Sequence, residues 1–273
     1  MSNGSSLLPH WQKEAERFHQ KVALLERRLS HPAIHDARVA MKKLRSYARL
    51  ADKVMHTSLR VSVAPFATLY RTAGACRDAY NATQLLQTFS RQLEYRFPLF
   101  EAYLKIALQA SARYLRKMFA LLPISENEWL LLAEPQGLGK MLSAQTVQAM
   151  QDEVQALWEN VKMPASSRDA EALHELRKEL KRLFYWLEVV PVSQTFAFRH
   201  HRELEDLNSL LGKWHDLYQL ERRVRTFREE LLGKGTNERR QLKLLLKEIE
   251  QRKRKRYEAM CEKLSFLLKA YPK

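Results

Sequence analysis

A pattern of ten residues occurs twice in this chain, and it constrains the fold more than any other feature of the sequence. Residues 35–45 read HDARVAMKKLR and residues 174–184 read HELRKELKRLF. Both have the form His-acid-x-Arg-x-x-x-Lys-basic-Leu, and the second copy begins 139 residues after the first (174 − 35). Because this offset is about half of the 273 residues, the sequence predicts a duplicated domain rather than a short solenoid repeat.

Each copy separates its cations from its apolar residues when it is placed on a helix of 100° per residue. In the first copy one row, about 80° wide, holds a histidine and four cations: His35, Arg38, Lys42, Arg45 and Arg49. The opposite side is apolar, with Val39, Ala40, Leu44, Tyr47 and Leu50. The second copy repeats the row with His174, Arg177 and Lys181, and the apolar side with Leu176, Leu180, Leu183 and Trp186.

Such a row of cations indicates an anionic partner. Like charges at i,i+4 repel each other, so a solvated helix ordinarily mixes signs. A solvated charged face is the alternative for either copy alone, but two copies at half-chain spacing make it the weaker interpretation. The whole chain carries +16, with 47 Lys+Arg against 31 Asp+Glu, which favours nucleic acid, an acidic membrane surface or another phosphate polymer as the partner.

Composition predicts an all-α fold with long helices. The chain has only 7 glycines and 9 prolines, and no segment alternates polar and apolar residues as a strand does. We expect two pseudo-symmetric antiparallel bundles of four to five long helices each, with a basic central groove or pore. The halves are residues 1–123 and 140–273, joined by a linker over 124–139 that contains a short helical turn at Trp129 to Leu132.

Helix boundaries follow from capping and breaking residues. The expected helices cover 7–29, 32–55, 58–73, 77–95, 99–121, 140–161, 194–211 and 236–269, with the second signature helix between the sixth and the seventh of these. Ser166, Ser167 or Asp169 is expected to cap the second signature helix, and Pro191 to close it. Gly74 and Gly212, 138 residues apart (212 − 74), are expected to end helices, which places Asp78 and Asp216 in the first turns of the next ones.

These residues resemble the CHAD family, which is named for its histidine-containing α-helical domain. The resemblance rests on the two signatures above and on Leu210-Leu211-Gly212-x-x-His215-Asp216-Leu217 with its partner Gly74-x-x-Arg77-Asp78, and it extends over nearly the whole chain. It implies two pseudo-symmetric helical bundles around a basic pore or groove, binding of inorganic polyphosphate, and targeting to polyphosphate granules. The chain leaves no room for the triphosphate tunnel enzyme to which such domains can be fused, so a stand-alone binding module is expected.

Twelve residues are the candidate polyphosphate ligands: His35, Arg38, Lys42, Lys43, Arg45, Arg49, Arg77, His174, Arg177, Lys178, Lys181 and Arg182. Phe184 stands where the first copy has Arg45, and His215 where it has Arg77, so the second half presents fewer cations. The two histidines either donate a neutral N–H to phosphate or become cationic beside the polyanion. A buried histidine bonded to a backbone carbonyl is the alternative.

Catalysis is not expected. The sequence contains no GxxxxGK[ST], GxSxG or HExxH motif, and its histidines and two cysteines, Cys76 and Cys261, lack the spacing of a closed zinc site. No cofactor or metal is therefore predicted. Both cysteines are expected to be reduced thiols of a cytoplasmic protein, since the N-terminus lacks a signal peptide and no run is long enough to span a membrane.

Three alternatives to polyphosphate binding remain open. A nucleic-acid-binding helical protein would use the basic run 252–256, but single-strand binders expose aromatic side chains, whereas Tyr47 and Trp186 fall on apolar sides. A helical interaction protein would bind an acidic protein partner. A membrane-surface role for 236–256 competes with ordinary core packing by Leu242, Leu245 and Ile249. The oligomeric state stays open between monomer and dimer.

Overall fold

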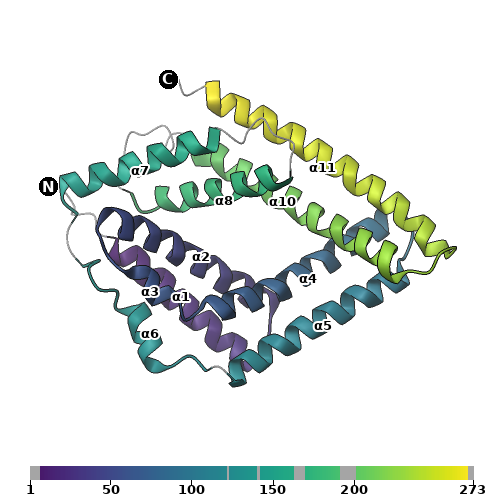
Figure 1. Cartoon of the computed structure of the whole chain (residues 1–273), viewed down its shortest axis with the longest axis horizontal. Coiled ribbons are helices and arrows are strands. Elements are labelled where there is room, and N and C mark those ends of the chain that lie inside the picture. The colour runs from purple at the N-terminus through teal and green to yellow at the C-terminus, as the bar shows by residue number, and fades with distance from the viewer. Residues whose placement is uncertain (1–6, 122, 140–141, 163–169, 191–200, 270–273) are drawn as a thin grey trace. The chain divides into compact units, whose positions relative to one another are not determined.

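The computed structural model describes residues 7–121, 123–139, 142–162, 170–190 and 201–269, and no strand occurs in these ranges. The expected all-α class is confirmed. The elements, in chain order, are α1 (Leu8–Arg27), α2 (His31–Val54), α3 (Leu59–Val63), α4 (Ala67–Gln92), α5 (Pro98–Leu121), α6 (Glu126–Ala133), α7 (Ala144–Lys162), α8 (Ala170–Leu187), α10 (His201–Thr226), the π-helix η2 (Phe227–Leu231) and α11 (Asn237–Lys269) (Figure 1).

Local sequence accounts for several helix ends. At α2 the Ser30 hydroxyl accepts a hydrogen bond from the Ala33 N–H at 3.3 Å, and a proline occupies the first turn. Within the expected linker, Ser125 and Glu128 form a capping box that begins α6. The caps expected for α8 and the start of the helix expected at 194 lie outside the described residues: Ser166, Ser167, Asp169, Pro191 and positions 194–200.

The expected breaks at Gly74 and Gly212 are wrong. Gly74 lies inside α4 and Gly212 inside α10, so Asp78 and Asp216 are interior helix residues. A helix tolerates one glycine at a cost of about 1 kcal/mol, and buried neighbours such as Ala73 and Leu211 offset that cost. A Cβ added at Gly212 would meet no atom within 4 Å, and nothing in the structure explains glycine at this position.

The chain forms two compact units, and each draws on both halves of the sequence. The first comprises Met1–Ala73 and Leu115–Glu205, and the second comprises Gly74–Tyr114 and Asp206–Lys273. The boundaries therefore fall within α4, α5 and α10. The division of the sequence into halves at 124–139 and the internal pseudo-symmetry stay predictions.

The first unit is built on α1 and α2, which pack along each other (Figure 1). Trp11 and Phe18 of α1 are buried, and the Trp11 indole N–H donates to the Leu132 carbonyl of α6 at 2.7 Å. Trp129 of α6 packs on Phe66, with ring centroids 4.9 Å apart. The short helix expected in the linker is therefore confirmed, and it belongs to the core of this unit.

The second unit has its own apolar core, to which α4, α5, α10, η2 and α11 contribute. Glu238, only 5% exposed, accepts hydrogen bonds from the Leu99 and Phe100 N–H groups at 3.0 and 2.8 Å. This carboxylate at the start of α11 therefore caps α5, where backbone donors lack helical partners and negative charge is favoured.

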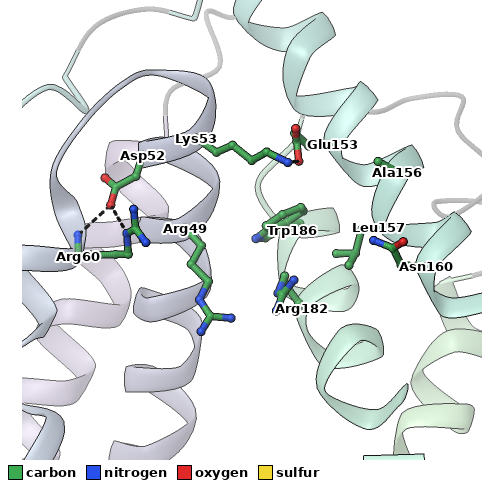
Figure 2. A pocket seen from close by; sticks show the side chains of 10 residues that line it. All are labelled: Arg49, Asp52, Lys53, Arg60, Glu153, Ala156, Leu157, Asn160, Arg182 and Trp186. Carbon is green, nitrogen blue, oxygen red and sulfur yellow. Dashed lines mark hydrogen bonds and ion pairs between the residues drawn. The ribbon is translucent and has the colours of Figure 1, made fainter. Parts of the chain in front are cut away.

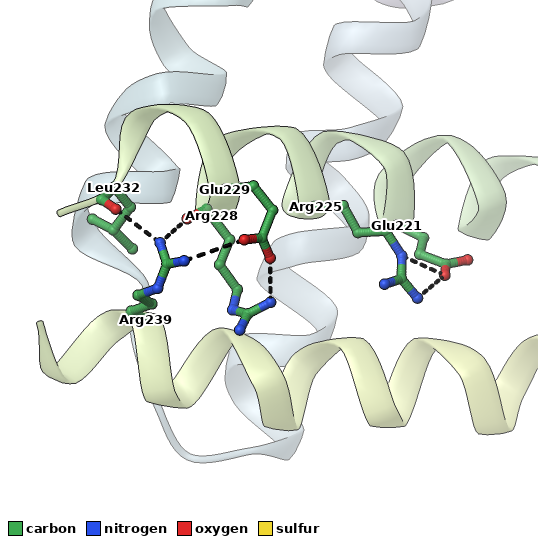
Figure 3. Close-up of polar contacts among 6 residues, drawn as sticks. All are labelled: Glu221, Arg225, Arg228, Glu229, Leu232 and Arg239. Carbon is green, nitrogen blue, oxygen red and sulfur yellow. Dashed lines mark hydrogen bonds and ion pairs between the residues drawn. The ribbon is translucent and has the colours of Figure 1, made fainter. Parts of the chain in front are cut away.

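Arg239 fixes the turn between η2 and α11. Its guanidinium donates to the Leu232 carbonyl at 2.9 Å and to the Arg228 carbonyl. It also pairs with Glu229 at 3.2 Å, which in turn pairs with Arg228 at 2.5 Å (Figure 3). Carbonyl groups at the end of a helix lack intrahelical donors, and this arginine supplies them.

Candidate anion site

The two signature helices, α2 and α8, both belong to the first unit and pack against each other. The Trp186 indole N–H of α8 donates to the Ser46 carbonyl of α2 at 2.9 Å. The Tyr47 hydroxyl of α2 donates to Glu188, just after α8, at 3.0 Å. The residues of the predicted apolar sides are buried, with Tyr47 and Trp186 only 1% and 4% exposed, except Val39, which is partly buried.

Two arginines of the α2 row lie on one aromatic ring. The Arg38 guanidinium lies 4.5 Å and that of Arg45 5.1 Å from the centroid of the Tyr70 ring of α4. Arg38 also donates to the Tyr70 carbonyl at 2.6 Å. Cation–π contacts hold a guanidinium in place without neutralising it. Among the described residues neither arginine forms an ion pair with an acid, so both keep their charge for an anion.

Lys43 is placed differently, and its contacts argue against the predicted role in anion binding. Its ammonium group pairs with Glu14 of α1 at 3.1 Å and with Glu188 at 2.7 Å, and the side chain is 17% exposed. Burial alone would lower the pKa of Lys43, but the hydrogen bonds and charges of Glu188 and Glu14 raise it above its ordinary value. We therefore assign Lys43 a structural role, joining α1, α2 and the end of α8.

A pocket of about 520 Å³ opens between α2, α3, α7 and α8 (Figure 2). Its lining includes four cations and two carboxylates from these helices, together with apolar side chains and one amide. The ten residues are Arg49, Asp52, Lys53, Arg60, Glu153, Ala156, Leu157, Asn160, Arg182 and Trp186. The pocket therefore brings together one predicted ligand from each signature helix, Arg49 and Arg182.

Positive charges are crowded at this pocket. Burial and the charges of Arg182 and Arg45 lower the pKa of Arg49 from its ordinary value, although an arginine stays protonated at any ordinary pH. Glu179 offsets part of this repulsion, since it pairs with Arg182 at 2.9 Å. A bound anion would relieve the rest, because opposite charge favours the protonated form.

Three further candidates lie on α8: His174, Arg177 and Lys178. Lys178 pairs with Glu175 at 2.5 Å, and both side chains are about half exposed, at 49% and 47%. Burial and the charges of Lys178 and Arg177 lower the pKa of His174 below its ordinary value. The lower pKa favours the neutral imidazole, the form that donates one N–H to a phosphate oxygen. Arg177 is partly buried.

The remaining candidates divide between the units. His35 is exposed on α2, and Lys42 of α2 and Lys181 of α8 are partly buried, all in the first unit. Arg77 belongs to the second unit, where its guanidinium lies 5.7 Å from the centroid of the Tyr80 ring.

Sequence reasoning missed two cations of the pocket, Lys53 and Arg60. Lys53 follows Arg49 by four residues, so extending the predicted row by one turn would have found it. Arg60 lies on the separate helix α3, and no periodic signal in the sequence connects it with the row.

Among the described residues, no group of three or more His, Cys, Asp or Glu side chains lies together as a metal site would require. No helix in the described part of the chain combines the length and apolar character needed to cross a membrane.

Comparisons with known proteins identify the family. The chain is similar in structure to the CHAD domain from the plant Ricinus communis, with a TM-score of 0.71, 18% identity, and coverage of 97% of this chain and 93% of that one. It is also similar to PptA from Streptomyces chartreusis, with a TM-score of 0.65, 12% identity, and coverage of 96% and 98%. A search of curated proteins found no match. Residues 7–225 match the CHAD domain, and the chain therefore belongs to the CHAD domain family.

Proposed function

We propose that this chain binds inorganic polyphosphate through the basic surface of α2 and α8, without catalysing a reaction. The observation that carries the proposal is the meeting of Arg49 from α2 with Arg182 from α8 at one pocket. Guanidinium groups make forked contacts with phosphate oxygens. A phosphate polymer needs cations spaced along a surface and little directional recognition, which is what the row Arg38, Arg45 and Arg49 provides.

The aromatic residues of the site favour a bare phosphate chain over nucleic acid. Proteins that bind single strands stack bases on exposed rings. Tyr47 and Trp186 are buried between α2 and α8, and the ring of Tyr70 supports two guanidinium groups. Nucleic acid would then bind as a weaker polyanion through charge alone.

The family supplies the wider expectations. The basic central pore, the participation of Arg77 and targeting to polyphosphate granules in the cytoplasm stay predictions of the resemblance. All three expectations are consistent with polyphosphate as the ligand, because each of them involves a phosphate polymer held by cations.

The proposal is tested by calorimetric titration with long-chain polyphosphate near physiological salt, followed by addition of single-stranded DNA. We expect tight binding that an excess of DNA does not reverse. Weak binding of polyphosphate beside tight binding of DNA would instead make the chain a nucleic-acid-binding protein. In that case the exposed Arg254 and Lys255 of α11 become the candidate site.

A further inference from the structure

The pocket lies at the C-terminal end of α2 and includes Arg49, the last predicted cation of the row. Arg38, Arg45 and Arg49 follow one another along the helix, at about 1.5 Å per residue. After Arg49 the helix reaches Asp52 and Lys53, and α3 and α7 contribute Arg60 and Glu153 to the pocket. The surroundings of the row therefore change from one helix face to a pocket formed by several helices.

Asp52 organises the α3 side of this pocket. Its carboxylate, whose side chain is 6% exposed, accepts hydrogen bonds from the Thr57 hydroxyl at 2.7 Å and the Leu59 N–H at 2.6 Å. It also accepts from the Arg60 backbone N–H and Nε–H, both at 3.1 Å (Figure 2). The bond to Nε orients the Arg60 guanidinium and leaves its two Nη groups as donors for a ligand.

The pocket also contains two carboxylates, and each of them is paired with a cation of the pocket. Asp52 is largely buried, and Glu153 of α7 pairs with Lys53 at 2.5 Å. An internal unit of polyphosphate carries about one negative charge and is bonded to phosphate on both sides. A terminal unit resembles a phosphomonoester, with a charge of about −1.5 to −2 at pH 7 and three oxygens available as acceptors.

We propose that this pocket binds the terminal phosphate of a polyphosphate chain between Arg49, Arg60 and Arg182, while internal units lie along the α2 row. Three guanidinium groups match the higher charge and the extra oxygens of a chain end. Asp52 is a positioning residue that acts through Arg60. This inference rests on the proposed function, since it specifies which part of the polymer each part of the surface binds.

The test compares a phosphate chain that has ends with one that has none. Linear tripolyphosphate and cyclic tetrametaphosphate are titrated by calorimetry into the wild type and four variants: Arg60→Ala, Arg60→Lys, Asp52→Asn and Arg28→Ala. Arg60 is 72% exposed at its side chain, so its replacement leaves the core intact. Arg28, exposed at the end of α1, is the control for the loss of one positive charge.

We expect Arg60→Ala to weaken the linear ligand about tenfold and the cyclic ligand less than about threefold. Arg60→Lys keeps the charge but not the fork, and should also lose preference for the linear ligand. Asp52→Asn should reproduce that loss, which a purely structural role of Asp52 would not produce. Arg28→Ala should change both affinities slightly and equally.

Equal losses for linear and cyclic ligands in Arg60→Ala would overturn the inference, as would long-chain polyphosphate binding without measurable binding of the linear triphosphate. Both results would leave the proposed function in place. If long-chain polyphosphate itself does not bind the wild type, the proposed function fails and the inference fails with it. The long-chain titration therefore distinguishes the two failures.

Discussion

The cation row of α2 in the first unit and the basic run of α11 in the second have different surroundings, although both look like binding sites in the sequence. In the first unit Arg38 and Arg45 lie on the ring of Tyr70. Burial and the positive charge of Arg182 lower the pKa of Arg49. These contacts fix the positions of the guanidinium groups and leave the positive charge largely uncompensated.

In the second unit the most basic run of the chain, residues 252–256, is partly neutralised. Arg252 pairs with Glu248 at 3.1 Å, and Lys253 with Glu221 of α10 at 2.5 Å. Glu221 also binds Arg225 at 2.7 Å (Figure 3). The Lys253–Glu221 pair links α10 to α11, and the other two pairs lie within one helix.

The comparison teaches that the density of Lys and Arg in a sequence does not locate an anion site. Arg38 and Arg45 meet an aromatic ring without an ion pair among the described residues. Arg252 and Lys253 also lie on rings, but each of them pairs with a carboxylate as well. The row on α2 separates cations from acids along one helix face, whereas α11 mixes the two signs within one turn, as in Lys247, Glu248 and Glu250. The predictions below test this difference.

Charge reversal on α2 should have the largest effect. Arg45→Glu with Arg49→Glu should weaken polyphosphate binding about a hundredfold or more, because two charge-assisted contacts become repulsive. Arg254→Glu with Lys255→Glu changes the net charge equally on exposed positions of α11 and should cost only a few-fold. Calorimetric titration measures the affinity of both double variants. Equal losses of affinity would contradict the distinction between the α2 row and the α11 run.

The neighbours Lys42 and Lys43 should separate binding from stability. Lys43→Met leaves Glu14, 4% exposed at its side chain, with the more distant Arg17 at 3.9 Å in place of Lys43 at 3.1 Å, and should lower the free energy of unfolding by about 3 kcal/mol. Polyphosphate affinity of the folded variant should stay near that of the wild type. Lys42→Met should weaken polyphosphate binding and leave the free energy of unfolding near that of the wild type. Denaturant unfolding measures the free energy of unfolding, and calorimetry measures the polyphosphate affinity. A stable Lys43→Met variant with weak binding would contradict the structural role of Lys43.

Tyr70 should have a moderate effect. Tyr70→Leu removes the ring beneath Arg38 and Arg45, and should weaken polyphosphate binding about three- to tenfold, since each cation–π contact contributes about 0.5–1 kcal/mol. Tyr70→Phe keeps the ring and should bind like the wild type. Titration of the two variants measures this, and similar affinities for both would exclude the ring as a support.

The smallest effect should come from replacing Glu221, and it concerns how the stability of the second unit changes at acidic pH. Burial alone would raise the pKa of Glu221, but the hydrogen bonds and charges of Lys253 and Arg225 lower it below its ordinary value. Its stabilisation is therefore present above the unfolded pKa, about 4.3, and is lost as the pH falls through the lower folded pKa.

Replacing Glu221 with Gln should lower the melting temperature by a few degrees at pH 7. The difference from the wild type should shrink as the pH falls below about 4, because protonation then removes the same charge. Thermal melts between pH 3 and 7 measure this. A difference that is constant over this range would show that Glu221 stabilises by packing alone.

Helical periodicity in the sequence predicted most of the fold, because each helix buries one apolar face. It failed at Gly74 and Gly212, where packing on both sides of the residue outweighs the helix-breaking tendency of glycine. It also could not predict the two units, since contacts between helices distant in the sequence define them.

The lining of the pocket was predicted in part, for a related reason. The helical wheel places cations on a face but does not show what the face meets. Lys43 and Arg182 occupy the same position in the two copies, eight residues after the histidine. One is bound by two carboxylates, and the other lines the pocket. Tyr70 and Arg60 come from other helices, so only tertiary structure connects them with the row.

Lysine acetylation with and without saturating polyphosphate tests the central claim most directly, because it compares both units within one unaltered protein. The account predicts slower acetylation, read by mass spectrometry, at three lysines of the first unit: Lys42, Lys53 and Lys181. It predicts unchanged acetylation at three exposed lysines of α11: Lys243, Lys247 and Lys255. Protection of the α11 lysines without protection of the first group would contradict it.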